Sequence, residues 1–163
     1  MIVETKRKGA RTIKDIPESI LEQLNRGEIE TANLVEFLAI DQKILLENLL
    51  TQCKKKEYLQ PVLEQIDKLK KQTVNTVSEA IGIGLLEQAT AHKDKDLLQT
   101  VSMHKSDLVR CWATFAVGKN TELNIEQMLH KIKPFAADKH FSTREDAWIA
   151  VGKAIILGQT HEI

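Results

Sequence analysis

The sequence predicts an all-α fold, specifically an α-solenoid (superhelix) of antiparallel helix pairs that forms one domain over residues 1–163. Three observations lead to this prediction. Only 7 Gly, 3 Pro and 4% aromatic residues are present, too few for the turns and strands of a β-sandwich or barrel. Apolar residues recur with the 3.6-residue period of a helix along most of the chain. A stretch of ten residues recurs after 34 positions, which is typical of stacked helical repeats.

The expected helices follow from this periodicity and from turn residues. They cover residues 15–27, 31–52, 61–71, 74–91 and 95–103, and three more begin after Ser106, Asn124 and Ser142. The segment 31–52 is expected to break near Asp41. Gly82 and Gly84 lower helix propensity in 74–91, so they indicate close packing against a neighbouring helix.

The ends of the last two helices carry specific signals. Asn124 with Gln127 resembles a capping box, in which two side chains satisfy the first free backbone N–H groups of a helix. Ser142-Thr-Arg-Glu145 has the full S-x-x-E form of the same motif. Pro134 is expected to end or kink the helix that begins after Asn124, because proline lacks a backbone N–H.

Charge excludes several functional classes. Lys+Arg and Asp+Glu both number 23, which fits neither a strongly basic nucleic-acid arm nor an acidic disordered chain. We expect a soluble, cytoplasmic protein without membrane association, because the chain has neither 18 consecutive apolar residues nor a signal-peptide core. Residues 1–14 are rich in basic groups and are expected to form a flexible terminus, with a phosphate-contacting arm as the alternative.

The repeat places Arg110-Cys-Trp-Ala-Thr-Phe-Ala-Val-Gly-Lys119 on Arg144-Glu-Asp-Ala-Trp-Ile-Ala-Val-Gly-Lys153, with six of ten residues identical. A helix pair cannot bury its apolar face alone, so stacking of such pairs is the expected solution. The segment around Gly82-Ile-Gly84 is a weaker third copy. The W-x2-L-G-x2-Y signature of tetratricopeptide repeats is absent, whereas Val109-Arg110-x-x-Ala113-x-x-Ala116-Val117-Gly118 resembles the core of HEAT repeats.

Longer stretches sharpen this resemblance. The segment Ser106-Asp107-Leu-Val109-Arg110-Cys-Trp112-Ala113, followed by Pro134 to Trp148, is similar to part of the DNA alkylation repair (AlkD/AlkC-type) HEAT-like repeat family. Lys8-Gly-Ala-Arg11 and Leu34-Val-Glu-Phe-Leu-Ala39 are similar to longer members. Asp146 stands where the V-R-E-W-A-W pattern has Trp, and the family continues with further repeats beyond the position of Ile163. The resemblance implies binding of double-stranded DNA in a repair context and raises the question of N-glycosylase activity.

The resemblance also implies roles for five residues. Glycosylases of this family hold the lesion between tryptophans while an Asp carboxylate stabilises the cationic sugar, and such chemistry needs an anion beside developing positive charge. Asp146 would then be catalytic, Trp112 and Trp148 would contact the lesion, and Arg110 and Arg144 would position phosphates.

Structural roles compete with each of these assignments. Trp112 fits a solenoid core, and Asp146 fits the first turn of a helix, where a carboxylate favours the positive dipole end. Arg110 and Arg144 could instead pair with Asp107 and Asp138, or Arg144 could stack on Trp148. Lys119 and Lys153 each follow their arginine by nine residues, which turns them about 180° away, so the four cations cannot form one patch.

Other chemistry has little support. No P-loop, dinucleotide-binding or H-E-x-x-H motif occurs, the five His residues lack ligand spacing, and Cys53 and Cys111 fit neither a disulfide framework nor a zinc site. We therefore expect no cofactor and no metal. The alternative function is a non-enzymatic interaction module that holds a protein partner or associates with itself through its C-terminal helix, whose Ala147–Val151 and Ala154–Leu157 segments are strongly apolar.

Overall fold

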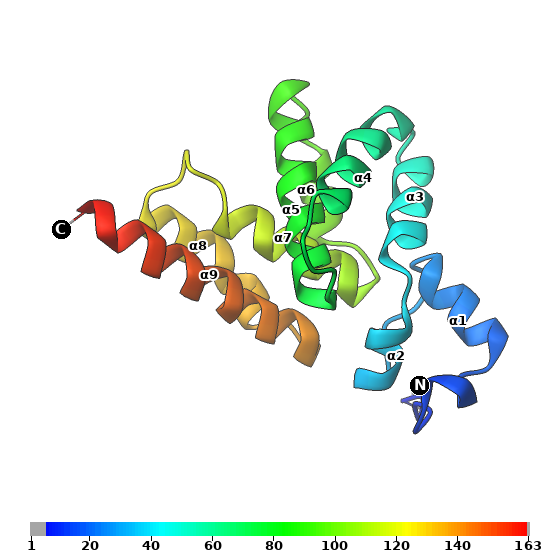
Figure 1. The fold of residues 1–163 in the computed structure, drawn as a ribbon. Coiled ribbons are helices and arrows are strands. Elements are labelled where there is room, and N and C mark those ends of the chain that lie inside the picture. Colours follow the sequence, from blue (N-terminus) through cyan, green and yellow to red (C-terminus); the bar gives the residue numbers. More distant parts are fainter. Residues whose placement is uncertain (1–5, 163) are drawn as a thin grey trace, which may run out of the picture.

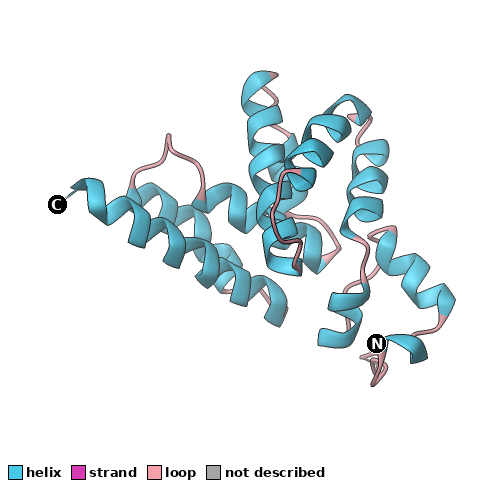
Figure 2. Cartoon of the chain, in the orientation of Figure 1, coloured by secondary structure: helices cyan, strands magenta, loops and turns pink. Residues whose placement is uncertain are grey.

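The computed structural model describes residues 6–162, with side chains to residue 156, and all regular structure in this part of the chain is helical (Figures 1 and 2). The elements are η1 (Ile13–Asp15), α1 (Glu18–Asn25), α2 (Leu34–Ala39), α3 (Gln42–Gln52), η2 (Lys56–Tyr58), α4 (Leu59–Asp67), α5 (Val74–Ala91), α6 (Leu97–Ser102), α7 (Asp107–Gly118), α8 (Ile125–Ala136) and α9 (Phe141–Glu162). The predicted all-α class is confirmed. None of the helices in these residues is long and apolar enough to cross a membrane.

The second half of the chain is built around α7. This helix contacts α6 and α8, its neighbours in sequence, and also α5 and α9. Thus α5, α7 and α9, which we call the central row, pack consecutively, and each also contacts the helix that precedes it in the chain (Figure 1). Helix α7 is buried along most of its length, and its Leu108, Trp112 and Phe115 are fully or almost fully buried.

Glycines allow the helices of the central row to approach closely. A methyl group at Gly82 of α5 would lie 2.5 Å from the carbonyl oxygen of Trp112, and one at Gly118 of α7 would lie 2.8 Å from that of Ala150. The prediction that Gly82 marks close helix packing is therefore confirmed. Gly152 occupies the place on α9 that Gly118 occupies on α7, and none of the described residues lies within 4 Å of a methyl group there.

Several predicted helix boundaries agree with the structure because local capping groups set them. Asp41 separates α2 from α3 and accepts hydrogen bonds from the backbone N–H groups of Lys43 and Ile44. The Asn124 and Gln127 capping box is formed. Helix α1 ends at Asn25, and Gly27 follows with a positive φ of 72°, a conformation that glycine adopts without strain.

The predicted capping box at Ser142 is wrong. Helix α9 begins one residue earlier, at Phe141, and the Ser142 hydroxyl donates to Asp107 of α7 at 2.8 Å. His140 caps the helix instead, since its Nδ1 accepts from the backbone N–H of Ser142 at 3.2 Å. Pro134 lies in the last turn of α8 and the helix continues to Ala136, so the proline neither ends nor breaks the helix at that position.

The beginning of the chain was expected to be a flexible basic terminus over residues 1–14. Residues 1–5 lie outside the described part. In residues 6–14, Arg7 is tied to the fold by two hydrogen bonds to Glu36, at 2.8 and 3.1 Å, and by one to the backbone oxygen of Glu30. The amide of Asn33 also donates to the backbone oxygen of Ala10. This stretch therefore packs on α2 rather than extending into solvent.

Candidate functional site

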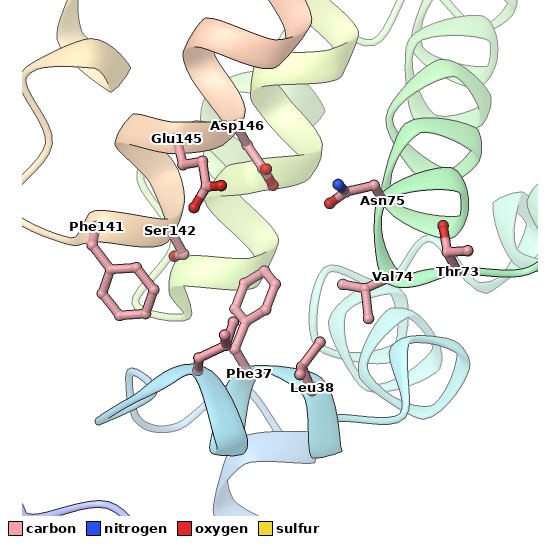
Figure 3. Close-up of a pocket in the computed structure, with 10 residues that line it drawn as sticks. Phe37, Leu38, Thr73, Val74, Asn75, Phe141, Ser142, Glu145 and Asp146 are labelled. Atoms are coloured by element: carbon pink, nitrogen blue, oxygen red, sulfur yellow. The ribbon is translucent and has the colours of Figure 1, made fainter.

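A cavity of about 410 Å³ lies between α2, the start of α5 and the start of α9 (Figure 3). Its apolar lining is Leu34, Phe37, Leu38, Val74 and Phe141. Its polar lining is Thr73, Asn75, Ser142, Glu145 and Asp146. The three elements that contribute these residues are far apart in sequence, so only the folded chain brings two aromatic rings and two carboxylates to one cavity.

Asp146 is the unusual residue of this cavity. Its side chain points into the cavity in Figure 3, and it is only 4% exposed. Its Oδ2 is the one buried side-chain polar atom among the described residues that has no hydrogen-bond partner. A buried, unpaired polar atom costs about 1–3 kcal/mol, so Oδ2 would gain free energy from any ligand group that donates a hydrogen bond or carries positive charge.

The environment of Asp146 shifts its titration. Burial raises the pKa of Asp146 to about 6; the carboxylates of Glu145 and Asp107 act in the same direction, and the Cys111 thiol acts against them. At pH 7 the side chain is therefore mostly ionised, yet it holds its charge in a buried position. Such a carboxylate attracts a cation or a strong hydrogen-bond donor more than a solvated one does.

The equivalent positions on α5 and α7 have partners. Ser78 and Trp112 stand 68 and 34 residues before Asp146, at the same place in the repeat. The Ser78 hydroxyl and the Trp112 Nε1–H both donate to Oε1 of Gln42, at 3.0 and 2.8 Å. Gln42, at the start of α3, thus accepts the hydrogen bonds of Ser78 and Trp112. No equivalent side chain is bonded to Oδ2 of Asp146.

The structure does not bring the two predicted lesion-contacting tryptophans together. Trp112 is completely buried in the core, with its only polar atom bonded to Gln42. Trp148 is 69% exposed and does not line the Asp146 cavity. The aromatic residues that do line it are Phe37 and Phe141. Sequence reasoning missed Phe37 because its place opposite Asp146 arises from the fold of α2 against α9.

Arg110 is wholly engaged inside the protein. Its guanidinium donates to both carboxylate oxygens of Asp138, at 3.0 and 3.2 Å, to Glu30 at 2.7 Å, and to the backbone oxygens of His104 and Lys105. All five N–H groups are used, as the structural alternative with Asp138 predicted. Burial alone would raise the pKa of Glu30, but the guanidinium holds that pKa below its ordinary value.

The three other basic residues of the repeated segments, Arg144, Lys119 and Lys153, are less buried than Arg110. Arg144 is exposed and donates to the backbone oxygen of Asp138 at 2.8 Å. Lys119 and Lys153 both reach Glu79 of α5, at 3.4 and 2.6 Å. As predicted, the four cations do not form one patch. Of the predicted phosphate contacts, only Arg144 remains available to a ligand.

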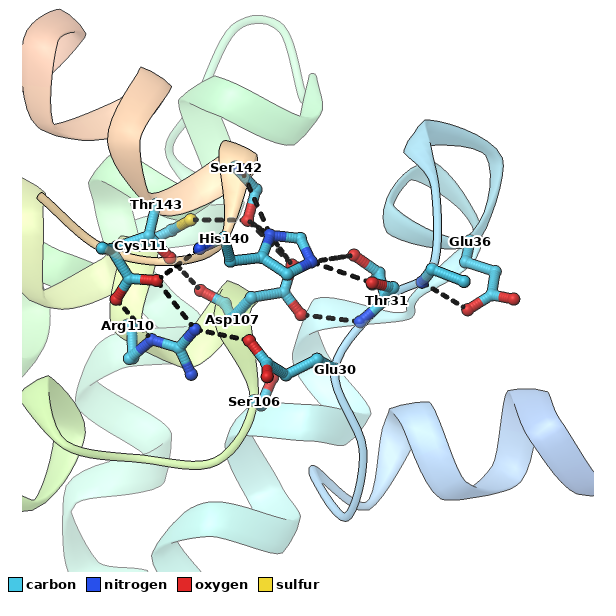
Figure 4. A network of polar contacts seen from close by, with 12 residues as sticks. Glu30, Thr31, Glu36, Ser106, Asp107, Arg110, Cys111, His140, Ser142 and Thr143 are labelled. Atoms are coloured by element: carbon cyan, nitrogen blue, oxygen red, sulfur yellow. Dashed lines mark hydrogen bonds and ion pairs between the residues drawn. The ribbon is translucent and has the colours of Figure 1, made fainter. Parts of the chain in front are cut away.

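A buried polar network joins the first third of the chain to α7 and α9 (Figure 4). Asp107, fully buried, accepts hydrogen bonds from the backbone N–H and the hydroxyl of Thr31, at 2.9 and 2.8 Å. It also accepts from Ser142 at 2.8 Å, and His140 Nδ1 lies 3.4 Å away. His140 Nε2 lies 2.8 Å from the backbone oxygen of Thr31 and must donate there.

This network contains Ser, His and Asp, but its geometry is not that of a nucleophilic triad. Such a triad places the serine at one imidazole nitrogen and the carboxylate at the other. Here Ser142 and Asp107 both lie on the Nδ1 side of His140, and the serine hydroxyl donates to the carboxylate. The network therefore holds helices together. No sequence pattern indicates this network, because Thr31 and His140 are 109 residues apart.

A second, larger cavity of about 870 Å³ is lined by residues of α5, α6, α7 and α8 and their loops. It carries apolar residues such as Leu98, Val117 and Phe135, with Lys93, Lys131 and other charged groups among the lining. No buried polar atom without a partner faces it among the described residues. The Asp146 cavity is therefore the better candidate for a specific site.

No family model, curated protein or solved structure matches this chain. The similarity to the DNA alkylation repair family stays a prediction from the sequence.

Proposed function

We propose that this chain is a HEAT-like helical-repeat protein that binds double-stranded DNA carrying alkylated bases, and that the Asp146 cavity receives the positively charged part of the lesion. The unpaired Oδ2 of Asp146, a buried residue that lines the cavity, carries this proposal. The packing of α5, α7 and α9, each with its preceding helix, supports an α-solenoid arrangement. The motif resemblance supports the choice of DNA.

The chemistry of the cavity suits such a lesion. Purines alkylated at a ring nitrogen carry a positive charge, and loss of the base leaves positive charge on the sugar. A carboxylate in a poorly solvated site stabilises either charge more strongly than a carboxylate in water. Phe37 and Phe141 offer ring surfaces of the kind on which bases stack.

Only one of the two predicted phosphate contacts is available to DNA. Arg110 is consumed by Asp138 and Glu30, so Arg144, which precedes the cavity residue Glu145, is the predicted cation that can still reach a phosphate. Arg144 should contribute a slope of about −0.9 to log K against log salt, as expected for one phosphate neutralised. Recognition of the lesion would supply most of the selectivity.

The test compares binding to a fluorescent duplex with and without one 7-methylguanine, at low and moderate salt. We expect tighter binding to the methylated duplex and loss of this preference in Asp146→Asn. Glu126→Gln makes the same charge change at an exposed position outside the cavity and should leave the preference intact. Equal affinity of the parent protein for both duplexes would contradict the proposal.

Base excision is a separate step that the same variants can test. If Asp146 stabilises the sugar cation, the protein should release methylated base and leave alkali-labile abasic sites, and Asp146→Asn should abolish the release. Release unchanged in Asp146→Asn would remove Asp146 from the catalytic role. No release, together with methyl-dependent binding, would identify a binding protein rather than an N-glycosylase.

A second function, that of a self-associating interaction module, is favoured by one observation. The last helix exposes large apolar side chains, with Trp148 at 69% and Ile156 at 71% exposure. Exposed apolar patches of this kind often mark interaction surfaces. This function does not exclude DNA binding, because Trp148 and Ile156 do not line the Asp146 cavity.

A further inference from the structure

The central row is packed through glycines, and Gly152, the glycine of α9 that corresponds to Gly118 of α7, is uncovered among the described residues. Gly82 of α5 lies against Trp112 and Ala116 of α7, and Gly118 of α7 lies against Ala150 of α9. Gly152 stands on α9 exactly one repeat after Gly118, and no described residue lies within 4 Å of the position that its Cβ would occupy. Gly118 lets α9 pack closely against α7. Gly152 offers the same kind of small-residue contact on α9, and no described residue fills it.

Large apolar side chains flank this glycine. Trp148 and Ile156 lie four residues before and four residues after Gly152, and residues four apart are neighbours on one side of a helix. Both are among the most exposed large hydrophobic side chains of the described residues. A small residue between two large ones makes a surface into which another helix can fit, with its own large side chains placed on either side of the glycine.

We propose that a second copy of this chain covers this surface, with α9 packed antiparallel against α9 across a twofold axis at Gly152; this inference rests on the self-association proposed above as the second function. The equal spacing makes the surface self-complementary, because an antiparallel pair centred there places Trp148 of one copy against Ile156 of the other, twice. The contact also continues the helix-on-helix packing of α5, α7 and α9.

Charge does not oppose this arrangement. The chain has a formal net charge of zero, so two copies do not repel each other as a whole. The cation next to the axis, Lys153, is directed to Glu79 of its own chain, with Nζ 2.6 Å from the carboxylate. Two lysines are therefore not forced together at the centre of the interface.

The first test is the mass of the protein in solution, measured by light scattering over a wide concentration range without DNA. We expect a dimer at high concentration and a dissociation constant raised roughly tenfold or more in Trp148→Gln, since a buried interface Trp carries much of the binding energy. Met103, 76% exposed and outside α9, supplies the matched control, and Met103→Gln should dimerise as the parent does. A monomeric mass at every concentration would overturn the proposal.

The two tryptophans give a second readout in the same samples. Trp112 is buried and Trp148 is exposed, so quenching by acrylamide reports chiefly on Trp148. Dilution should increase quenching as Trp148 becomes accessible. Quenching that does not change while the mass changes would show that another surface forms the dimer and would overturn the proposal.

Cysteine cross-linking tests the antiparallel geometry, in a Cys53→Ser background that removes the half-buried native thiol. Gly152→Cys should form a disulfide between copies, because the residue lies at the axis. Arg144→Cys should not, because residues eight positions from the axis in an antiparallel pair are about 24 Å apart along the helices. Efficient linkage through Arg144→Cys would indicate parallel helices and contradict the proposed axis. Far-UV circular dichroism of each variant checks that the fold is retained.

Discussion

Thr31 and Asp107 lie 76 residues apart in sequence and are joined by two buried hydrogen bonds, one from the Thr31 backbone N–H and one from its hydroxyl. Asp107 is fully buried and receives Ser142 from α9 as well. One carboxylate thus fixes the segment before α2, the start of α7 and the start of α9 to each other. Of these three parts, the start of α9 lines the cavity that contains Asp146, through Phe141 and Ser142.

Asp107→Asn should strongly destabilise the protein. An amide nitrogen replaces one carboxylate oxygen and faces the hydrogen-bond donors of Thr31 or Ser142, which leaves buried donors without an acceptor. We expect a loss of roughly 2–4 kcal/mol in the free energy of unfolding, measured by urea denaturation. Thr31→Val, which keeps the backbone hydrogen bond, should cost less. A loss below that of Thr31→Val would show that Asp107 is not the centre of the network.

The two equivalent glycines should respond oppositely to alanine. Gly118→Ala would bring a methyl group to 2.8 Å from the Ala150 carbonyl oxygen, so α7 and α9 must separate and the protein should lose roughly 1–3 kcal/mol of stability. Gly152→Ala meets open space and removes the glycine penalty of a helix interior, so it should gain about 0.5–1 kcal/mol in the monomer. Thermal unfolding at low protein concentration measures both. Similar effects at the two sites would contradict the packing described for α9.

Asp146→Asn should stabilise the protein at neutral pH. The pKa of Asp146 is about 6 in the folded state and 3.8 when unperturbed, so between these values the folded state keeps a proton that the unfolded state has lost. The contribution of Asp146 to the free energy of unfolding therefore falls as the pH rises from about 4 to 6, and it stays at this lower value above pH 6. At 1.36 kcal/mol per pKa unit the deficit is roughly 3 kcal/mol.

We expect Asp146→Asn to exceed the parent in stability by roughly 2–3 kcal/mol at pH 7.5 and to equal it near pH 4. Urea denaturation at the two pH values makes the comparison, with Glu126→Gln as the control for a simple change in net charge. A stability difference that does not depend on pH would argue against the raised pKa. Stabilisation together with loss of the methylated-DNA preference would indicate that Asp146 is retained for binding rather than for folding.

Arg110→Lys should weaken the fold and spare ligand binding. Lysine keeps the charge but cannot make the paired contact with Asp138 together with the bonds to Glu30 and the two backbone oxygens. We expect a loss of roughly 2–3 kcal/mol in stability. Affinity of the folded variant for duplex DNA should stay close to that of the parent, whereas Arg144→Gln should lower it. A large fall in DNA affinity for Arg110→Lys with little loss of stability would reverse these roles.

The predicted helices agree with the structure where local chemistry sets the boundary. The range 74–91 matches α5, and the break at Asp41 arises from that residue capping α3. Prediction failed at Ser142 because the same hydroxyl that could cap a helix is needed by Asp107 of another helix. A local motif cannot show which of two partners a side chain will choose, since the second partner is set by tertiary packing.

The candidate site could be predicted only in part. The 34-residue repeat and the motif similarity singled out Asp146, and the structure places it at a cavity. The same reasoning named Trp112 and Arg110, which the structure assigns to the core and to an internal ion pair. The opposite wall of the cavity, including Phe37, carries no sequence signal, because its position follows from long-range contacts of the kind made by Thr31.

The bonds of Thr31 to Asp107 and His140 also bear on the synthesis of the chain. The ribosome releases the first helices while the residues that hold them, 76 and 109 positions later, are still unmade. At ordinary elongation rates this delay is on the order of ten seconds, far longer than a helix needs to form. During translation the nascent N-terminal third must remain without its docking partner. Its apolar side chains, Phe37 among them, are then accessible to chaperones until α7 and the start of α9 have emerged and the contacts of Thr31 can form.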